Sequence, residues 1–332
     1  MFNQDTSKRL GILLVQLGTP DAPTTSAVRR YLAEFLWDPK VIELPRLLWW
    51  FVLHGIILRT RPKHAARLYQ KIWTEQGSPL LVISNAQRIA LENKLREKTK
   101  KSVSVYLGMR YGNPSLKDVL EEIRKHNIDL LFILPLYPQY ATATTGSAFD
   151  SVANLLSKWR KLPELHMVMQ YHDYSSYLDA LATSVEEAWQ KHLKPEKLLF
   201  SFHGLPIQAT LVGDPYEEQC HATARGVAER LQLKENEWTT SFQSRVGPAT
   251  WLQPYTDETL EKWAKTGIQR VDVFCPGFSA DCLETLEEVQ LRYRDLFLSA
   301  GGKTYHFILS LNDRPDHIDA LADLILNRLC LN

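Results

Sequence analysis

Two segments of the chain combine residue types that could bind a metal ion or accept a proton. In Leu198–Pro206, an apolar run ends at His203, and Gly and Pro follow it. In Val271–Val289, a second apolar run is followed by Asp281, Glu284 and Glu288, at the helical spacing i, i+3 and i+7. A neutral imidazole facing a line of carboxylates is a suitable site for a divalent transition metal.

Each feature also has a purely structural interpretation. A single His is more often a hydrogen-bonded structural residue than a catalyst. Acids in the first turn of a helix commonly form a solvated face that interacts favourably with the helix dipole. The position at the ends of predicted strands favours the functional interpretation, because ligands of doubly wound folds bind beyond the carboxyl ends of the strands.

The elements that would position these residues alternate between short apolar strands and amphipathic helices. The predicted strands are 11–17, 103–107, 130–134, 166–170, 198–202, 239–242 and 271–274, and predicted helices include 116–125, 177–192, 257–265 and 316–331. This alternation predicts parallel sheets with crossover helices. We therefore predict an α/β fold of two doubly wound, Rossmann-like domains over 1–163 and 164–314, with a C-terminal helix over 315–332 packing back on the first domain.

Composition excludes several classes of function. The chain has 332 residues, 45% apolar and 23% charged, which is typical of soluble globular proteins. A net charge of +1 argues against a nucleic-acid partner. There is no G-x-G-x-x-G, phosphate-loop or H-E-x-x-H motif. The polar start, Met1–Arg9, has no apolar leader segment, and the cysteines form no close pair, so the cytoplasm is the expected compartment.

One apolar stretch, Leu47–Leu58, interrupts this ordinary pattern. It reads LLWWFVLHGIIL and is shorter than the ~20 residues that a membrane-spanning helix needs. Either it is a buried core helix, or it is an exposed lip that touches a bilayer or an apolar ligand. The adjacent Trp49 and Trp50 suit an interfacial position, and so do the flanking arginines Arg46, Arg59 and Arg61.

Several longer motifs resemble the ferrochelatase family. They are LLVQLGTPDAP, PLYPQYATATTGS, SFHGLP, GDPY, FQSRVGPATWLQPYTDETL and PGFSADCLETLEE. The resemblance runs from about Gly11 to the final helix and is strongest to the proteobacterial branch. It implies a chelatase-like fold and a lyase that inserts Fe²⁺ into protoporphyrin IX, releasing two protons, in the last step of haem biosynthesis.

The resemblance also implies roles for individual residues. His203 corresponds to the central catalytic residue and Glu284 to its partner across the active-site cleft, and both, with Glu288, correspond to metal contacts. Whether His203 acts mainly as base or as ligand stays open. Other positions match porphyrin contacts: Met109, Arg110, Tyr111 and Trp251 in the cleft, and Arg59, Lys63 and Ser244 at the propionates. Leu47–Leu58 corresponds to the family's lip, which can face the inner membrane, and this favours the lip over a core helix.

The chain departs from the family pattern at four places. Cys282 stands where many relatives have His, and Arg292 stands where relatives often have an acid. Leu17 replaces the Tyr of the coproporphyrin-using branch, which favours protoporphyrin IX as substrate. Only Cys330 lies near the C-terminus, so the resemblance implies no [2Fe–2S] cluster and no other cofactor.

Three other functions are compatible with parts of the pattern. The first is a chelatase for another metal or for a tetrapyrrole such as sirohydrochlorin. The second is a porphyrin carrier without turnover, which would not need the carboxylates opposite His203. The third is a hydrolase built from Ser201, His203 and Asp214, but no G-x-S-x-G nucleophile elbow surrounds Ser201.

Overall fold

The structure, a computed structural model, describes residues 9–99, 102–247 and 249–330. It divides into two compact units that both contain a four-stranded parallel sheet. Unit 1 comprises the chain up to 136, then 142–169 and the segment from 318 onward, and unit 2 comprises 137–141 and 170–317. Two doubly wound parallel α/β units are the fold class that the sequence predicts, and the prediction is confirmed.

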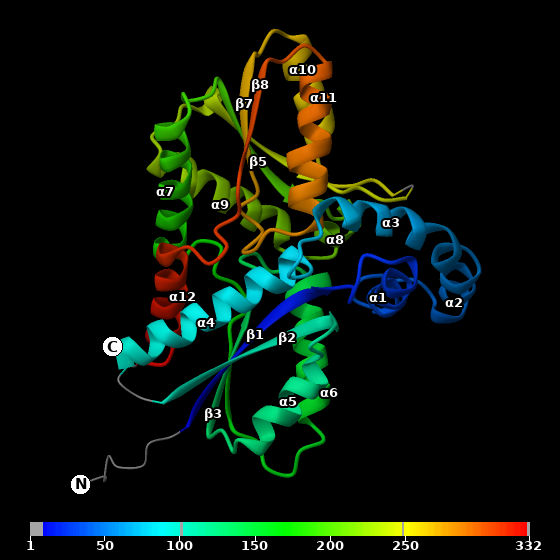
Figure 1. Cartoon of the computed structure of the whole chain (residues 1–332), viewed down its shortest axis with the longest axis vertical. Helices are drawn as coiled ribbons and strands as arrows, with labels where there is room; N and C mark the ends of the chain where they lie inside the picture. Colours follow the sequence, from blue (N-terminus) through cyan, green and yellow to red (C-terminus); the bar gives the residue numbers. More distant parts are fainter. Residues whose placement is uncertain (1–8, 100–101, 248, 331–332) are drawn as a thin grey trace. The chain divides into compact units, whose positions relative to one another are not determined.

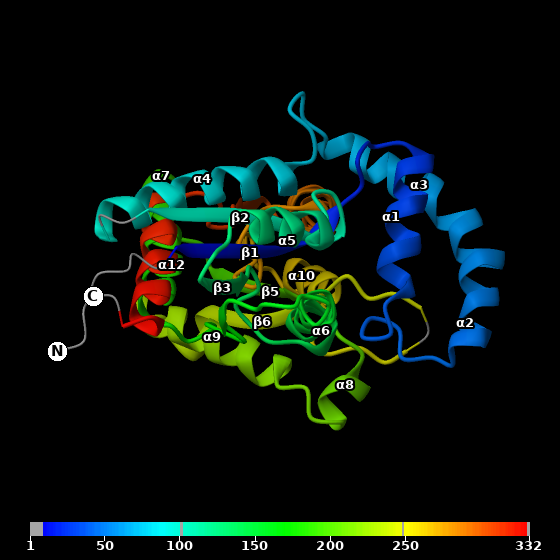
Figure 2. The ribbon, with the colours of Figure 1, turned by 90° about the horizontal axis from the view of Figure 1, so that it is seen from below.

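The sheet of unit 1 has the strand order β2-β1-β3-β4. Its strands are β1 (Leu10–Thr19), β2 (Val103–Gly112), β3 (Leu130–Pro135) and β4 (Glu164–Met167). Its helices are α1 (Thr25–Trp37), α4 (Pro79–Thr99), α5 (Leu116–Lys125) and α6 (Ser147–Leu156), with a short π-helix, η2 (Thr142–Gly146). Helix α4 lies on the face of the sheet opposite α6, and Figure 2 shows the sheet between them.

The last helix, α12 (Pro315–Arg328), belongs to unit 1 from Ile318 onward. Lys94 of α4 forms an ion pair of 2.9 Å with Asp319, and Lys98 pairs with Asp323 at 2.5 Å. The sequence suggested a boundary at 163/164. In the structure, unit 1 continues to residue 169, because β4 hydrogen-bonds to β3 and completes the first sheet.

The sheet of unit 2 has the strand order β6-β5-β7-β8. Its strands are β5 (Lys197–His203), β6 (Trp238–Gln243), β7 (Arg270–Phe274) and β8 (Thr304–Ile308). Its helices are α7 (Ser175–Lys191), α8 (Ile207–Leu211), α9 (Tyr216–Arg230), η3 (Glu235–Glu237), α10 (Thr256–Lys265), η4 (Glu284–Tyr293) and α11 (Arg294–Ser299). In Figure 1, β5, β7 and β8 lie between α7 on one side and α10 and α11 on the other.

Strand β8 is an element that the sequence did not predict. Its residues, TYHFI, mix polar and apolar types, and it pairs only with β7, at the edge of the sheet. An edge strand needs no continuous apolar run, because it is not enclosed on both sides. The apolar runs of β5 and β7, in contrast, are almost entirely buried.

The apolar stretch of the sequence forms a continuous helical segment. It consists of α2 (Arg46–Val52), the π-helix η1 (Leu53–Ile57) and α3 (Leu58–Ile72). Pro62 lacks an N–H, so the carbonyl of Leu58 accepts a hydrogen bond from Arg29 Nε instead, at 2.9 Å. Within the described residues, no helix combines the length and the apolar character needed to cross a bilayer.

This stretch has a buried face and an exposed face. Trp49 is buried with Leu53, Leu58 and Leu36, and its indole N–H donates to the Leu36 carbonyl at 2.7 Å. The other face is exposed, with 75% of Leu47 and 60% of Phe51 accessible to solvent, and Leu48, Trp50 and Ile56 also exposed. We call these five exposed side chains the apolar lip.

Candidate active site

His203 is the last residue of β5, and one of its two ring nitrogens is already occupied. Its Nδ1 lies 2.7 Å from the carbonyl oxygen of Gly204. A carbonyl can only accept a hydrogen bond, so Nδ1 carries the proton in the neutral ring. Nε2 therefore keeps its lone pair, and the half-buried imidazole can act through that atom as a base or as a metal ligand.

Gly204 allows the chain to turn tightly beside this imidazole. A Cβ atom at this position would lie 2.8 Å from the carbonyl oxygen of Gln243 and 3.3 Å from the ring of Trp251. Trp251 pairs with Pro206 and donates its indole N–H to the Val246 carbonyl at 3.1 Å. The predicted substrate contact Trp251 thus packs against the turn that follows His203.

Glu284 begins the π-helix η4, which follows β7 in the chain. The spacing in the sequence predicted that Asp281, Glu284 and Glu288 lie on one face of a helix. This prediction is wrong for Asp281. Asp281 precedes the helix and is only 1% exposed. Its carboxylate accepts hydrogen bonds from Thr285 Oγ1 at 2.9 Å and from Asn312 Nδ2 at 2.8 Å. It therefore anchors the start of η4.

Glu288 is buried, and both of its carboxylate oxygens have partners. Ser244 Oγ donates to Oε2 at 2.5 Å, and the Tyr293 hydroxyl donates to Oε1 at 2.7 Å. Arg292 approaches Oε1 at 3.4 Å. Ser244, predicted to meet a propionate, is thus engaged with Glu288 here, and its backbone has φ = 65°, in the left-handed region.

Gln243 connects the segments that carry His203 and Glu284, although the sequence did not single it out. In the β5–β6 register it is the partner of His203, and its carbonyl accepts from Gly204 N at 2.7 Å. Its side-chain Nε2 lies 3.4 Å from the Glu284 carbonyl oxygen. His203 and Glu284 therefore lie on segments joined at the carboxyl edge of one sheet. Its place directly after the predicted strand 239–242 was the signal that could have identified it.

Cys282, at the position where many relatives have His, is a buried thiol. Burial, and then the neighbouring Glu284 carboxylate, raise its pKa well above the usual range. Its backbone N–H donates to Thr285 Oγ1 at 2.9 Å. A thiol that stays protonated is a weak ligand and a poor base, so it does not replace the chemistry of an imidazole.

Three of the predicted contacts of unit 1, Met109, Arg110 and Tyr111, lie near the end of β2, and the last two bind Asp38. The Tyr111 hydroxyl donates to Asp38 Oδ2 at 2.8 Å, Ser147 Oγ donates at 2.6 Å, and Arg110 forms an ion pair with the same oxygen. Burial opposes ionisation of Asp38, but the bonds from Ser147, the Lys40 backbone and Tyr111 hold its pKa below the usual value.

Met109 and Tyr111 are completely buried, and Arg110 is held by this internal ion pair. Porphyrin contacts through these three side chains therefore rest on the resemblance alone. Arg59 and Lys63 differ from them, because they are exposed one turn apart on α3. Neither has a hydrogen bond or an ion pair to any residue that the structure describes, so both cations are available to a carboxylate ligand.

The hydrolase interpretation finds no support in the geometry. Ser201 is fully buried and donates to Gln243 Oε1 at 2.6 Å. Asp214 accepts from the backbone N–H of Tyr216 at 3.0 Å. No bond between Ser201, His203 and Asp214 occurs among the described residues. Among the residues that the structure describes, no group of three or more His, Cys, Asp or Glu side chains is arranged to hold a metal ion.

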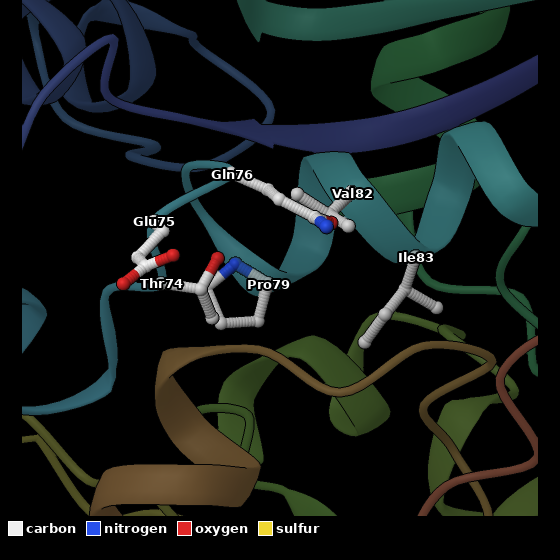
Figure 3. Close-up of a pocket in the computed structure, with 6 residues that line it drawn as sticks. All are labelled: Thr74, Glu75, Gln76, Pro79, Val82 and Ile83. Atoms are coloured by element: carbon white, nitrogen blue, oxygen red, sulfur yellow. The ribbon is translucent and has the colours of Figure 1, made fainter.

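Among the described residues, two of the open hollows are formed by side chains other than His203 and Glu284. One in unit 1 encloses about 460 Å³ and is drawn in Figure 3. It is lined by the turn before α4 and by the first turns of that helix: Thr74, Glu75, Gln76, Pro79, Val82 and Ile83. The other, in unit 2, is lined by the α8–α9 loop, which includes Asp214, and by the first turns of α9, which include His221. The sequence singled out Asp214 in the second hollow but no residue of the first.

Comparison with known proteins gives a consistent result. A family model described as Ferrochelatase matches residues 9–329. A ferrochelatase of Nitrosococcus oceani is 55% identical, covering 98% of this chain and 88% of that protein. One of Thioalkalivibrio sulfidiphilus is 53% identical, covering 99% and 89%.

Solved structures resemble the fold at much lower sequence identity. SirB from Bacillus subtilis with Fe³⁺ has a TM-score of 0.57 at 10% identity, covering 96% of this chain and 94% of that one. CbiX, described as the terminal enzyme for biosynthesis of sirohaem in denitrifying bacteria, has a TM-score of 0.52 at 13% identity, covering 96% and 98%. These similarities concern the fold alone.

Proposed function

This chain belongs to the ferrochelatase family, and from that premise we propose that it inserts Fe²⁺ into protoporphyrin IX to form protohaem. The observation that carries the proposal is the geometry of His203, which ends β5 at the carboxyl edge of the sheet. Its Nδ1 is bonded to Gly204, so Nε2 keeps its lone pair, and Gln243 joins the same edge to Glu284. Iron is a substrate in this reaction and not a resident cofactor.

The residues of unit 2 account for the movement of protons in the proposed reaction. Insertion of one Fe²⁺ ion replaces two pyrrole N–H protons, so a base must lie at the face of the macrocycle. His203 Nε2 accepts a proton there, and the hydrogen bond from Nδ1 to Gly204 holds the ring in the required tautomer. The Glu284 carboxylate, half-buried at the start of η4, is available for the second proton or for the metal.

Charge and shape account for recognition of the porphyrin. The exposed cations Arg59 and Lys63 are suited to pair with propionates. Leu17 stands where the coproporphyrin-using branch has Tyr, which supports protoporphyrin IX as the substrate. A protein that binds the ring in a bent form would stabilise the transition state relative to the relaxed substrate, because the bent ring presents its nitrogens to an incoming ion.

The apolar lip supports a peripheral contact with a membrane, at the inner face of the cytoplasmic membrane. Five apolar side chains are exposed together on α2 and η1. Arg59, Arg61, Lys63 and Arg67 are exposed on the adjoining helix α3. Apolar groups beside cations are the combination that binds an anionic bilayer surface.

A direct assay tests the proposed reaction. Purified protein is mixed anaerobically with Fe²⁺ and protoporphyrin IX, or aerobically with Zn²⁺ and protoporphyrin IX, and the absorption spectrum is followed. We expect the metalloporphyrin spectrum to appear with enzymatic turnover. If Co²⁺ enters sirohydrochlorin while protoporphyrin is left unchanged, the protein is a chelatase of another specificity. Tight binding of protoporphyrin without turnover would instead indicate a carrier.

Variants at three residues test the assigned roles in the same assay. His203→Ala should lower kcat at least about a hundredfold and leave porphyrin binding measurable, because general bases contribute on that scale. Glu284→Gln should reduce kcat strongly. Glu288→Gln should reduce it less, since Ser244 and Tyr293 already bind its two oxygens. Normal turnover of His203→Ala would remove the role assigned to that imidazole.

A further inference from the structure

Gln243 is a buried polar side chain, 2% exposed, whose contacts reach both halves of the proposed catalytic pair. It is the last residue of β6. Its backbone carbonyl binds the N–H of the residue after His203, and its side chain reaches the first residue of η4, Glu284. A buried polar group with this distribution of bonds has more than a packing role.

The chemistry of its neighbours fixes the orientation of the Gln243 amide. The Glu284 carbonyl can only accept, so the atom facing it must be the donor Nε2. On the other side, Ser201 Oγ donates to Oε1 at 2.6 Å, and the Cys275 thiol lies 3.6 Å from the same oxygen. Burial raises the pKa of Cys275 well above its usual value, so the thiol keeps its proton and can also donate.

Only a primary amide satisfies both sides at this position. A Glu side chain would place a second acceptor against the Glu284 carbonyl, and a Met side chain would offer neither donor nor acceptor. The contact from Nε2 to the Glu284 carbonyl, at 3.4 Å, is long for an N–H···O bond. Active-site hydrogen bonds are often long before the substrate complex forms and tighten within it.

We propose that Gln243 is a positioning residue for metal insertion, which sets the start of η4, and hence Glu284, relative to the turn that holds His203. This inference rests on the proposed function. The backbone bond to Gly204 survives any substitution at 243, whereas the bond to η4 depends on the amide. Loss of the amide therefore displaces Glu284 without touching the substrate, and the effect should fall on kcat and not on porphyrin binding.

The test compares Gln243→Met and Gln243→Glu with the wild type in zinc and iron insertion into protoporphyrin IX. We expect kcat to fall roughly ten- to a hundredfold, the scale expected for a small misplacement of a catalytic group. KM and the dissociation constant for porphyrin, the latter measured without metal by fluorescence, should change by less than about twofold. Ser201→Ala removes the hydroxyl that donates to Gln243 Oε1, and it should also lower kcat, by a smaller factor.

Ser241→Ala is the matched control. Ser241 is equally buried two residues earlier in β6 and contacts Thr256 and the Phe200 carbonyl, but it has no bond to η4. The Ser241→Ala variant should be less stable than the wild type. Its kcat should remain within about twofold of the wild-type value. Equal kcat losses in Ser241→Ala and Gln243→Met would overturn the positioning role. A folded Gln243→Met variant with the kcat of the wild type would also overturn it. If Gln243→Met does not fold, the same result in Ser201→Ala would overturn it. Failure of the wild type to insert either metal would refute the proposed function instead.

Discussion

At the scale of single residues, His203 and His317 show how surroundings decide the use of an imidazole. In each, Nδ1 lies 2.7 Å from a backbone carbonyl, of Gly204 and of Asn312 respectively. Nε2 of His203 is on a half-buried ring beside the turn at Gly204, whereas Nε2 of His317 is fully buried with no partner in the structure. The same local bond thus produces a candidate base in one place and a structural residue in the other.

Burial of His317 predicts a loss of stability in acid. Burial lowers its pKa from 6.5 to about 4 in the folded protein. The unfolded chain therefore binds the proton more readily, and stability falls as the pH drops below about 6.5. At pH 5 the loss should be about 2 kcal/mol relative to pH 7.5, by linkage between the two pKa values.

The measurement is urea unfolding at pH 7.5 and pH 5, with His317→Gln as the comparison. The Gln amide can keep a donor near the Asn312 carbonyl but does not titrate, so the variant should lose less stability over this interval, by about 2 kcal/mol. All other titrating groups are common to both proteins. Identical pH dependences would show that His317 is not the group responsible.

At the scale of elements, two π-helical segments determine what the adjacent side chains can do. In η4 the acids do not follow the spacing of an α-helix, and Asp281 lies outside the helix altogether. In the lip segment, η1 separates α2 from α3 and begins with the buried Leu53, while Ile56 within it is exposed. An extra residue per hydrogen-bonded turn rotates the following side chains about the helix axis.

The exposed lip predicts binding to anionic vesicles. The double substitution Leu47→Ser and Phe51→Ser should weaken vesicle binding, measured by cosedimentation, about thirtyfold, because each side chain contributes on the order of 1 kcal/mol when it is buried in the interface. Thermal stability should be nearly unchanged, since both side chains are already exposed. Ile89→Ser on α4 is a suitable control, as Ile89 is also exposed but lies outside the lip. Equal binding by all three proteins would remove the membrane role.

At the scale of the whole molecule, the distribution of cysteines bears on cofactor content. Cys220, Cys275 and Cys282 are buried in unit 2, and Cys330 is exposed near the end of the chain. An iron–sulfur cluster needs several thiolates at one place. The wide spacing of the four cysteines along the sequence supports the proposal that the enzyme works without a resident metal or cluster.

The purified protein should therefore show no visible absorption bands of an iron–sulfur cluster. Exhaustive treatment with EDTA should leave the melting temperature within about 1 °C of its starting value, because no metal binding contributes to folding. Turnover should return on addition of Fe²⁺ or Zn²⁺ alone. Bound iron and inorganic sulfide in stoichiometric amounts would contradict this expectation.

The sequence by itself determined the fold class, the family and the location of His203. Apolar strands alternating with amphipathic helices specify parallel sheets, because both faces of such sheets must be covered. His203 ends the apolar run of β5, and a polar residue at that point must lie at the carboxyl edge of the sheet. Local pattern and chain direction are sufficient for these conclusions.

Only the tertiary structure decided which polar residues are free and which are engaged. Arg110 is neutralised by Asp38, which is 72 positions away in sequence, and Glu288 is bound by Ser244, 44 positions away. Gln243 is identified as the connection between His203 and Glu284 only through the pairing of β5 with β6 and the contact with η4. Such partners are brought together by packing between elements, and no spacing along the chain encodes them.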